Sequence, residues 1–433
     1  MFLCGSAKAE ITPGPELFCR IYGLMAVPYA GVIDPLFLRV IACSDGKEKA
    51  LIISFDLDKA PEPKLWLPVL EEHTGISKDK IIYIGTHTHS APITTERPRE
   101  VKRQVSQEMK DGMEAYENMV LEKLLETADQ ALADMVPARM GYGKGESYIN
   151  TNRNAEFYFE TEEGSIDPYT SQGPNNAAPV DRTVFVCRIE NQNGDPIAFF
   201  VNYAMHCSTM FLNRYDKENN MGISGDIAGT VSRFMENRFP GCVAVWSSGA
   251  AGDVNPVIAN EVFYPDPENG SVKQYIFPDS KVINELMISL AARHLEDILN
   301  VSRNISRLTD QVKIAGAVEW SETPMLEGEE PYRIRLHLLR LGDVALYGIG
   351  GELYSSFGSL IRRHSPLANT IILNHDASLI DDAGYIMDDE TMARVRRNTA
   401  MKSRLPGHNN KTAPGYIGDS LVEHTESLFH KVL

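Results

Sequence analysis

Short β-branched runs alternate with segments of helical periodicity along most of this chain, and this alternation limits the folds open to it. Strand-like runs occupy residues 36–43, 50–56, 80–84, 183–189, 197–203, 243–246, 334–341, 344–348 and 370–373. Helical periodicity is found over 63–73, 107–135, 227–238, 282–299 and 352–363. Such alternation is typical of α/β proteins. No shift in composition marks a boundary, so the sequence predicts one large domain over residues 1–433, with mixed β-sheets flanked by helices.

Composition argues against several classes of partner. The 433 residues carry a formal net charge of −17 and contain no basic run, so no nucleic-acid partner is expected. No apolar run approaches the ~20 residues that span a bilayer, and no transmembrane segment is predicted. The N-terminus becomes polar too early for a signal peptide. We therefore expect a cytoplasmic protein, or a secreted or periplasmic one if a leader has been removed.

Two polar stretches interrupt the alternation of strands and helices. Residues 144–180 are rich in Asn, Gly and Ser and are predicted to form a long surface segment. Residues 258–278 are polar and rich in aromatic side chains, and are predicted to form a second loop with the character of a lid. Long loops of this kind are often functional, so both are candidates to border a site.

The most informative local motif is Gly85-Thr86-His87-Thr88-His89-Ser90, which directly follows the strand-like run 80–84. Ligands and reacting groups collect at such strand ends in α/β sheets. On extended backbone the two imidazoles of an H-x-H pair point the same way and can reach one point. The pair suits a metal ion, or a metal ligand beside a proton-handling group. It equally suits two hydrogen-bonded histidines that cap the strand.

Further polar clusters also follow predicted strands. They are His206, the run 247–253, Glu352 and the run 381–385, which ends in Tyr385. Loops at the carboxyl edge of a sheet converge, and two histidines with one carboxylate are a common ligand set for catalytic zinc. Each residue alone also has a structural interpretation: His206 as a core histidine, Glu352 as the first-turn acid of a helix, and Tyr385 as a packing residue.

Taken together, these motifs resemble the catalytic domain of the neutral (alkaline, non-lysosomal) ceramidase family over nearly the whole chain. Residues 85–92 are close to the family's G-T-H-T-H-S-G-P, its most specific motif. Other segments similar to family motifs are 9–13, 33–36, 150–153, 206–210, 224–226, Gly351-Glu352 and Gly384-Tyr385. The resemblance implies a mixed α/β domain with a metal at the carboxyl edge of its sheet.

The resemblance also implies roles for individual residues. Family members hold one Zn²⁺ with two histidines, a glutamate and a tyrosine. The corresponding residues here are His87, His206, Glu352 and Tyr385. By the same resemblance, His89 would handle protons beside the metal, and Arg153 would orient the polar head of the substrate.

Two features depart from the family pattern. In Gly252-Asp253-Val254-Asn255-Pro256, Asn255 stands where the family has a serine that ceramidases need. An amide is no nucleophile, although it can donate a hydrogen bond to an oxyanion. The family's C-terminal immunoglobulin-like domain is expected to be missing, because the sequence ends at Leu433.

The leading hypothesis is a zinc-dependent hydrolase that cleaves the amide bond of an N-acyl substrate, either ceramide-like or smaller, with water activated by the metal. In this hypothesis His89 moves the proton, while Arg153 and Asn255 stabilise negative charge. One alternative is a hydrolase of another bond, such as an ester or a sugar amide. The other is a non-catalytic relative that keeps the metal site for structure or ligand binding, and Asn255 favours that alternative.

Overall fold

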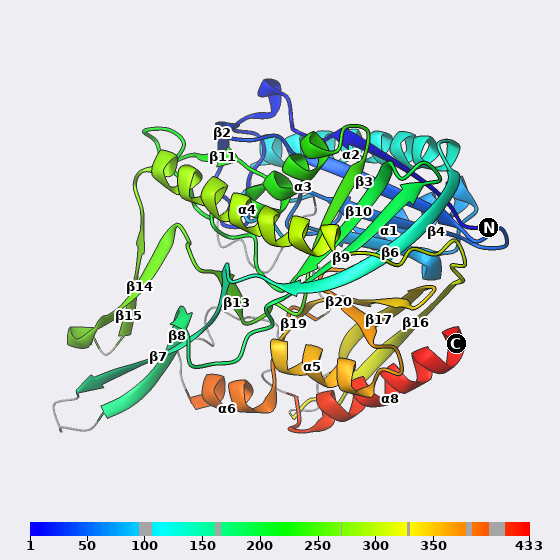
Figure 1. The fold of residues 1–433 in the computed structure, drawn as a ribbon. Helices are drawn as coiled ribbons and strands as arrows, with labels where there is room; N and C mark the ends of the chain where they lie inside the picture. Colours follow the sequence, from blue (N-terminus) through cyan, green and yellow to red (C-terminus); the bar gives the residue numbers. More distant parts are fainter. Residues whose placement is uncertain (95–105, 161–165, 270, 327–329, 378–382, 398–411) are drawn as a thin grey trace.

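Two mixed β-sheets stack face to face, and helices cover the outer face of each (Figure 1). This computed structural model describes residues 1–94, 106–160, 166–269, 271–326, 330–377, 383–397 and 412–433. The layers therefore run in the order helix, sheet, sheet, helix. The prediction of an α/β fold with mixed sheets flanked by helices is confirmed.

The larger sheet has eight strands. In spatial order they are β12 (Val243–Ser248), β10 (Pro196–Tyr203), β9 (Thr183–Asn191), β6 (Val136–Glu146), β1 (Leu3–Glu10), β3 (Phe37–Ser44), β4 (Lys49–Phe55) and β5 (Ile81–Gly85). The pairs β10–β12 and β4–β5 are parallel, and the remaining neighbours are antiparallel. The parallel pairs lie at the two edges of the sheet, and each places two carboxyl ends side by side.

Alternate residues of the central strands pack into different cores. In β3, Leu38 and Val40 pack beneath the helices α1 (Pro63–Thr74) and α2 (Gln107–Ala133). Ile41, on the opposite face, belongs to the core between the two sheets. Both faces of the strand are buried, so its apolar residues do not alternate with polar ones, and only Arg39 interrupts the run from Phe37 to Cys43. This is why these strands can be recognised from sequence.

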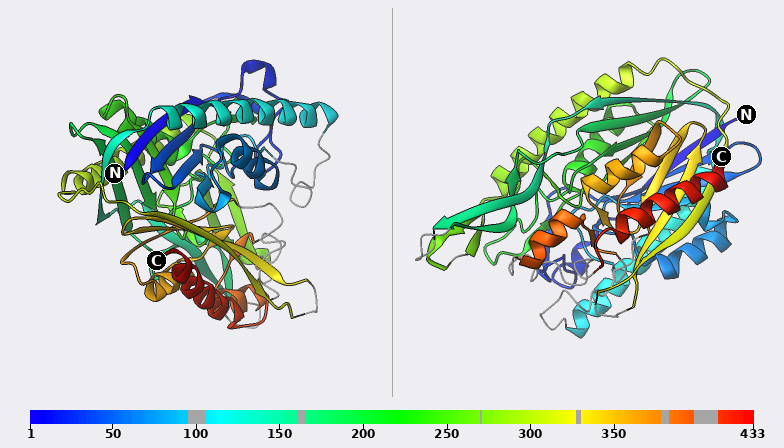
Figure 2. Two further views of the ribbon diagram at one scale, coloured as in Figure 1. Left: turned by 90° about the vertical axis from the view of Figure 1, so that its right-hand side faces the viewer. Right: turned by 90° about the horizontal axis from the view of Figure 1, so that it is seen from below.

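The remaining helices complete the outer layers. The half of the large sheet formed by β9, β10 and β12 is covered by α3 (Asp226–Arg238) and α4 (Ser280–Arg303). The smaller sheet has the order β16 (Ile314–Thr323), β17 (Tyr332–Leu341), β18 (Val344–Ile349) and β20 (Asn369–Leu373). Its outer face is covered by α5 (Ser355–His364) and α8 (Tyr416–Val432) (Figure 2).

The short elements lie mainly in the connections. They are β2 (Tyr29–Val32), β11 (Met221–Ile223), β13 (Val254–Pro256), β19 (Glu352–Leu353), β21 (Tyr385–Ile386), α6 (Asp389–Arg397) and the 3₁₀ turns η1 (Pro15–Leu17), η2 (Lys78–Lys80) and η3 (Pro267–Asn269). Among the helices of the described residues, none combines the length and the apolar character needed to cross a bilayer.

The two stretches predicted to be loops are instead largely β-hairpins. Much of 144–180 forms the paired strands β7 (Asn150–Glu160) and β8 (Ile166–Asn175). Within 258–278 lie β14 (Glu261–Asp266) and β15 (Ser271–Ile276), and β14 lies against β7 and β8. Both hairpins project from one end of the molecule (Figure 1). The prediction of loops was wrong because polar residues on projecting strands hide the alternation that a half-buried strand shows.

One buried arginine ties the large sheet to α3. Arg39 of β3 is fully buried, and its guanidinium lies 2.8 Å from the carboxylate of Asp56 and 2.7 Å from that of Glu236. Glu236 also pairs with Lys8 at 2.6 Å. Charges removed from water are stable only when they are paired, so this network fixes α3 on the sheet.

Replacing Arg39 with Leu is expected to lower the free energy of unfolding by about 3–5 kcal/mol, because two buried carboxylates lose the cation that balances them. Chemical denaturation at pH 7 measures the loss. Arg333→Leu is the matched control: Arg333 pairs with Glu322 at 3.0 Å on the surface, and its loss should cost less than about 1 kcal/mol. Equal small losses in both variants would contradict this role for Arg39.

Candidate metal centre

Loops from the carboxyl ends of three strands meet at one place. His87 and His89 follow β5, His206 follows β10, and Glu352 follows β18. The first two loops are joined directly, because the backbone N–H of His89 donates to the carbonyl of Cys207 at 3.0 Å. The sheets therefore bring together side chains that are far apart in the sequence.

Glu352 lies in a short strand, not in a helix as the sequence predicted. In β19 it pairs in parallel with Tyr385 of β21, and its N–H donates to the carbonyl of Gly384 at 2.7 Å. Helix α5 begins only at Ser355, whose N–H and hydroxyl donate to the carboxylate of Asp253. Asp253 thus supplies the acid at this helix start, which leaves Glu352 directed toward the histidines.

The carboxylate of Glu352 lies between two imidazoles. Its Oε2 is 3.1 Å from Nε2 of His206 and 3.6 Å from Nε2 of His87. Nε2 of His89 is 3.2 Å from Nε2 of His87. The Tyr385 ring stacks along that of His206, with 6.3 Å between centroids, and its hydroxyl is hydrogen-bonded to Glu352. The four residues of the implied ligand set therefore surround a common point.

The opposite edges of the two imidazoles are fixed by oxygen atoms. Nδ1 of His87 lies 2.9 Å from Oδ1 and 3.1 Å from the backbone carbonyl of Asp58. Nδ1 of His206 lies 3.0 Å from the carbonyl of Val254. Contacts of this kind orient metal-binding histidines and leave Nε2 for the ion. Two such imidazoles, a carboxylate and a phenol form a donor set that fits a divalent cation.

Electrostatics of the cluster also suit a cation. Burial alone would lower the pKa of His87, but the carboxylates of Glu352 and Asp58 outweigh it and raise that pKa to about 9. Burial raises the pKa of Glu352 by itself, yet the imidazoles bring it well below its usual value. Burial lowers the pKa of His206 to about 4, and that of His89 well below the usual range. The carboxylates thus hold a proton on His87, where metal binding would displace it.

Arg153 and Asn255 border the cluster from the neighbouring strands β7 and β13. Nη1 of Arg153 donates to Oδ1 of Asn255 at 3.2 Å, and Nη2 donates to the carbonyl of Gly252 at 2.8 Å. The guanidinium lies 5.0 Å from the centre of the Tyr385 ring. The structure therefore brings all the predicted site residues into one set of contacts. Their chemical roles stay predictions.

Sequence reasoning missed two residues of the cluster, Asp58 and His375. Asp58 follows β4, and His375 follows β20, so both come after a strand as the recognised residues do. The rings of His375 and His87 stack 3.8 Å apart. Of the acidic run before Tyr385, Asp381 and Asp382 lie outside the described residues.

Asp376 anchors the loop that carries His375 to both sheets. One carboxylate oxygen accepts from the N–H of Tyr83 in β5 at 2.9 Å. The other lies 2.8 Å from Nη1 of Arg335 and 2.7 Å from Nδ1 of His337, both in β17. Burial by itself would raise the pKa of Asp376, but these partners outweigh it and lower the pKa to about 2.

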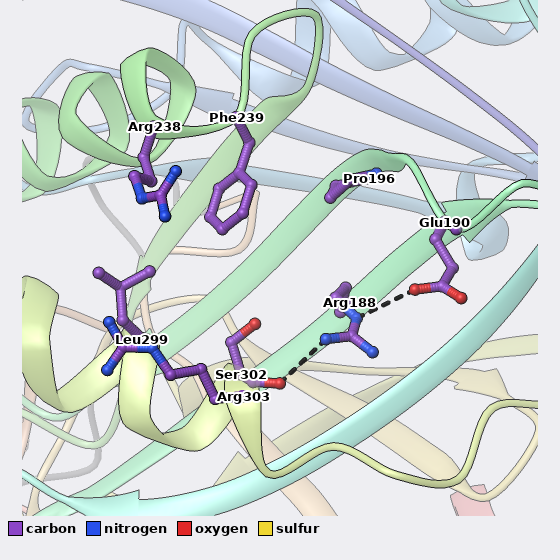
Figure 3. Close-up of a pocket in the computed structure, with 9 residues that line it drawn as sticks. Arg188, Glu190, Pro196, Arg238, Phe239, Leu299, Ser302 and Arg303 are labelled. Carbon is purple, nitrogen blue, oxygen red and sulfur yellow. Dashed lines mark hydrogen bonds and ion pairs between the residues drawn. The ribbon is translucent and has the colours of Figure 1, made fainter.

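A separate pocket lies among β9, β10, α3 and α4 (Figure 3). It has a volume of about 350 Å³ and is lined by Arg188, Arg238 and Arg303 among others. Arg188 donates to the carbonyl of Ser302 at 3.0 Å and lies 3.3 Å from Glu190. Arg238 and Arg303 lie in the last turns of their helices, where positive charge balances the helix dipole. These arginines therefore have structural partners, and we assign no ligand to this pocket.

A four-layer fold with a buried His/Glu/Tyr cluster at its strand ends defines a protein with a candidate divalent-cation centre. Residues 2–272, more than half of the chain, match the family described as neutral/alkaline non-lysosomal ceramidase, N-terminal. The chain therefore belongs to this family, as the sequence motifs predicted. The matched range includes His87, His89, Arg153, His206 and Asn255, whereas Glu352 and Tyr385 lie beyond it.

Individual relatives match over part of their length. Neutral ceramidase B of Dictyostelium discoideum is 28% identical over 185 residues, which cover 41% of this chain and 23% of that protein. Neutral ceramidase A of the same organism is 27% identical over 199 residues, which cover 42% of this chain and 25% of that protein. The matched segments therefore span about a quarter of these relatives.

Solved structures show the same fold. The crystal structure of neutral ceramidase from Pseudomonas aeruginosa superposes with a TM-score of 0.69 at 14% identity, over 99% of this chain and 74% of that chain. A structure of ceramidase complexed with C2 gives a TM-score of 0.68 with the same identity and coverage. The likeness is one of fold and extends over nearly the whole chain.

Replacing Asp376 with Asn is expected to cost less stability as the pH falls. A carboxyl whose pKa is lowered in the folded state stabilises the protein above its unfolded pKa of ~4, and that stabilisation is lost as the pH falls toward 2. The difference in unfolding free energy between the native protein and the variant should shrink by about 1 kcal/mol between pH 7 and pH 3.

Denaturant unfolding from pH 7 to pH 3 measures that difference. Asp343→Asn, in the exposed turn between β17 and β18, gives the effect of removing one surface charge. A difference that stays constant with pH for Asp376→Asn would contradict the ion pairs assigned to it.

Proposed function

We propose that this protein is a metal-dependent hydrolase, with Zn²⁺ as its ion, that cleaves the amide bond of an N-acyl substrate. The observation that carries this proposal is the convergence of His87, His206, Glu352 and Tyr385 on one buried point, with His89 beside it. Family membership supports it, since the relatives that match are named neutral ceramidases. Ceramide is itself an N-acyl compound, and the substrate class is taken from it.

The ion would be held by the two Nε2 atoms, the Glu352 carboxylate and the Tyr385 phenol. When bound, a Zn²⁺ ion polarises a carbonyl group and makes water a stronger nucleophile near neutral pH. Imidazole, carboxylate and phenol donors suit zinc, and the fixed Nδ1 contacts of both histidines hold the donors in place before the ion arrives.

In this proposal His89 moves a proton. It is partly exposed, whereas His87, His206 and Glu352 are buried, so a substrate can reach its ring from outside. Its backbone is fixed by the bond to Cys207, and its ring packs against Phe211 with 5.3 Å between centroids. A general base within hydrogen-bond distance of the reacting atoms can accept a proton from water and return it to the departing amine.

In this proposal Arg153 and Asn255 stabilise negative charge. The guanidinium is buried and cannot lose its proton, so it keeps a positive charge beside the Tyr385 ring. Oδ1 of Asn255 accepts from Arg153, which directs the amide NH₂ group as the donor for a ligand. No serine nucleophile is required in this scheme, because water is the nucleophile.

One observation favours a second candidate function, the capture of a ligand without cleavage. Asn255 replaces the serine that the sequence motif leads one to expect, and it is held by Arg153. A protein of this kind would bind N-acyl compounds at a loaded metal centre and release them intact. A third candidate is a hydrolase of another bond, and turnover of an ester or a sugar amide in place of a lipid amide would identify it.

Purified protein is expected to contain one zinc ion per chain and to hydrolyse at least one member of a panel of N-acyl amides, esters and sugar amides. A chelator should abolish turnover, and added Zn²⁺ should restore it. Glu352→Gln should lower turnover by at least about 100-fold, because it removes a charged ligand. Elemental analysis measures the zinc content, and mass spectrometry detects the products of hydrolysis.

Glu319→Gln is the matched control, since Glu319 lies on β16, away from the cluster, and pairs with Lys431 and His424 of α8. It should keep both zinc and turnover. Stoichiometric zinc without chelator-sensitive turnover on any substrate would reject the hydrolase and leave ligand capture.

Replacing His89 with Gln is expected to lower kcat by about 10²–10⁴-fold, because proton transfer loses its base. Zinc content should stay at one ion per chain, since His89 is not in the implied ligand set. Steady-state kinetics and metal analysis on the same preparation test this. A variant that loses its zinc along with its activity would show that His89 is a ligand instead.

A further inference from the structure

His375 is the most unusual side chain near the centre. It is 1% exposed, and neither ring nitrogen has a hydrogen-bond partner among the residues that the structure describes. Buried histidines elsewhere in the chain are satisfied: His294 contacts Ser147 and Trp246, and His337 contacts Asp376 and the carbonyl of Asp79. A buried polar group without a partner costs free energy, so its presence calls for a ligand.

The backbone at His375 is held in an uncommon conformation. Its φ is +64°, in the left-handed region that most side chains avoid. The neighbours on both sides are fixed: Asn374 contacts Ser248 and Leu353, and Asp376 carries the ion pairs to β17. Strain of this kind persists only where the surroundings impose it, and it is concentrated at functional sites.

The position of the ring points to the metal. One ring nitrogen of His375, one ring nitrogen of His87 and one carboxylate oxygen of Glu352 all lie within 4.8 Å of one another. The three side chains follow β5, β18 and β20, that is, strands of both sheets. An additional imidazole is thus placed beside two members of the implied ligand set.

We propose that His375 is an additional ligand of the divalent cation at His87 and Glu352, so that the centre uses three imidazoles in place of two. The inference rests on the metal site of the proposed function. It gives one of the two free nitrogens of His375 a partner, and it explains why a strained loop holds this buried ring beside His87 and Glu352.

Binding requires a small movement of the ring. The ring planes of His375 and His87 are inclined by 19° with 3.8 Å between centroids. In this stacked arrangement the nitrogen lone pairs of the two rings do not point at one common atom. Rotation about the Cβ–Cγ bond turns a nitrogen of His375 toward the ion, and this torsion is broad for histidine.

The test compares two variants of the full chain, His375→Phe and His375→Asn. Phe keeps a stacked ring and removes both nitrogens, whereas Asn accommodates the left-handed backbone and removes the imidazole. Competition with a chromophoric chelator gives the Kd for Zn²⁺, and both variants should bind roughly 10-fold or more weakly than the native protein. The visible spectrum of Co²⁺-loaded protein should change, because the number of ligands falls.

His294→Phe is the matched control, a buried histidine outside the cluster, and it should leave the Kd and the Co²⁺ spectrum unchanged. Unchanged Zn²⁺ affinity and Co²⁺ spectra in both His375 variants would overturn the inference. So would two ions in the native protein and one in the variants, since His375 would then serve a separate site.

The same measurements separate this inference from the proposed function. If the native protein binds Zn²⁺, Glu352→Gln does not, and the His375 variants match the native protein, only the role of His375 fails. If the native protein binds no divalent cation, the proposed metal centre fails and the inference fails with it.

Discussion

The carboxylate of Glu352, buried between two imidazoles, is the contact on which the rest of the site depends. It follows β18 of the smaller sheet, while His87 and His206 follow β5 and β10 of the larger one. A carboxylate removed from water is tolerated only with partners close by, so the two sheets must hold their loops in a fixed relation. The core between the sheets and the ion pairs of Asp376 supply that relation. Stacking of the sheets is therefore a condition of the site as well as of the fold.

Much of the fold could be predicted because the central strands are buried on both faces. A strand such as β3 is apolar at nearly every position, with Arg39 as the interruption, and this differs plainly from the periodicity of α2. The hairpins β7–β8 and β14–β15 could not be recognised, since their strands project from the sheets and carry polar residues. Their structure depends on contacts with each other, and such contacts leave no local pattern.

The candidate site was predictable where one local signal recurs, a polar residue after a strand. That signal placed His87, His206 and Glu352 together. It failed for Asp58 and His375, because many loops contain polar residues and nothing local distinguishes these two. The helix expected at Glu352 was wrong for a similar reason: Asp253, a hundred residues earlier in the chain, supplies the acid at the start of α5. Relations of this kind exist only in three dimensions.

The donors around the centre are distributed from Asp58 to Tyr385, over both sheets. No short fragment can gather them, so the centre assembles only after distant parts of the chain have met. Tight metal binding would then report on the folded state of most of the molecule at once, because the bound ion would link residues that follow strands of both sheets.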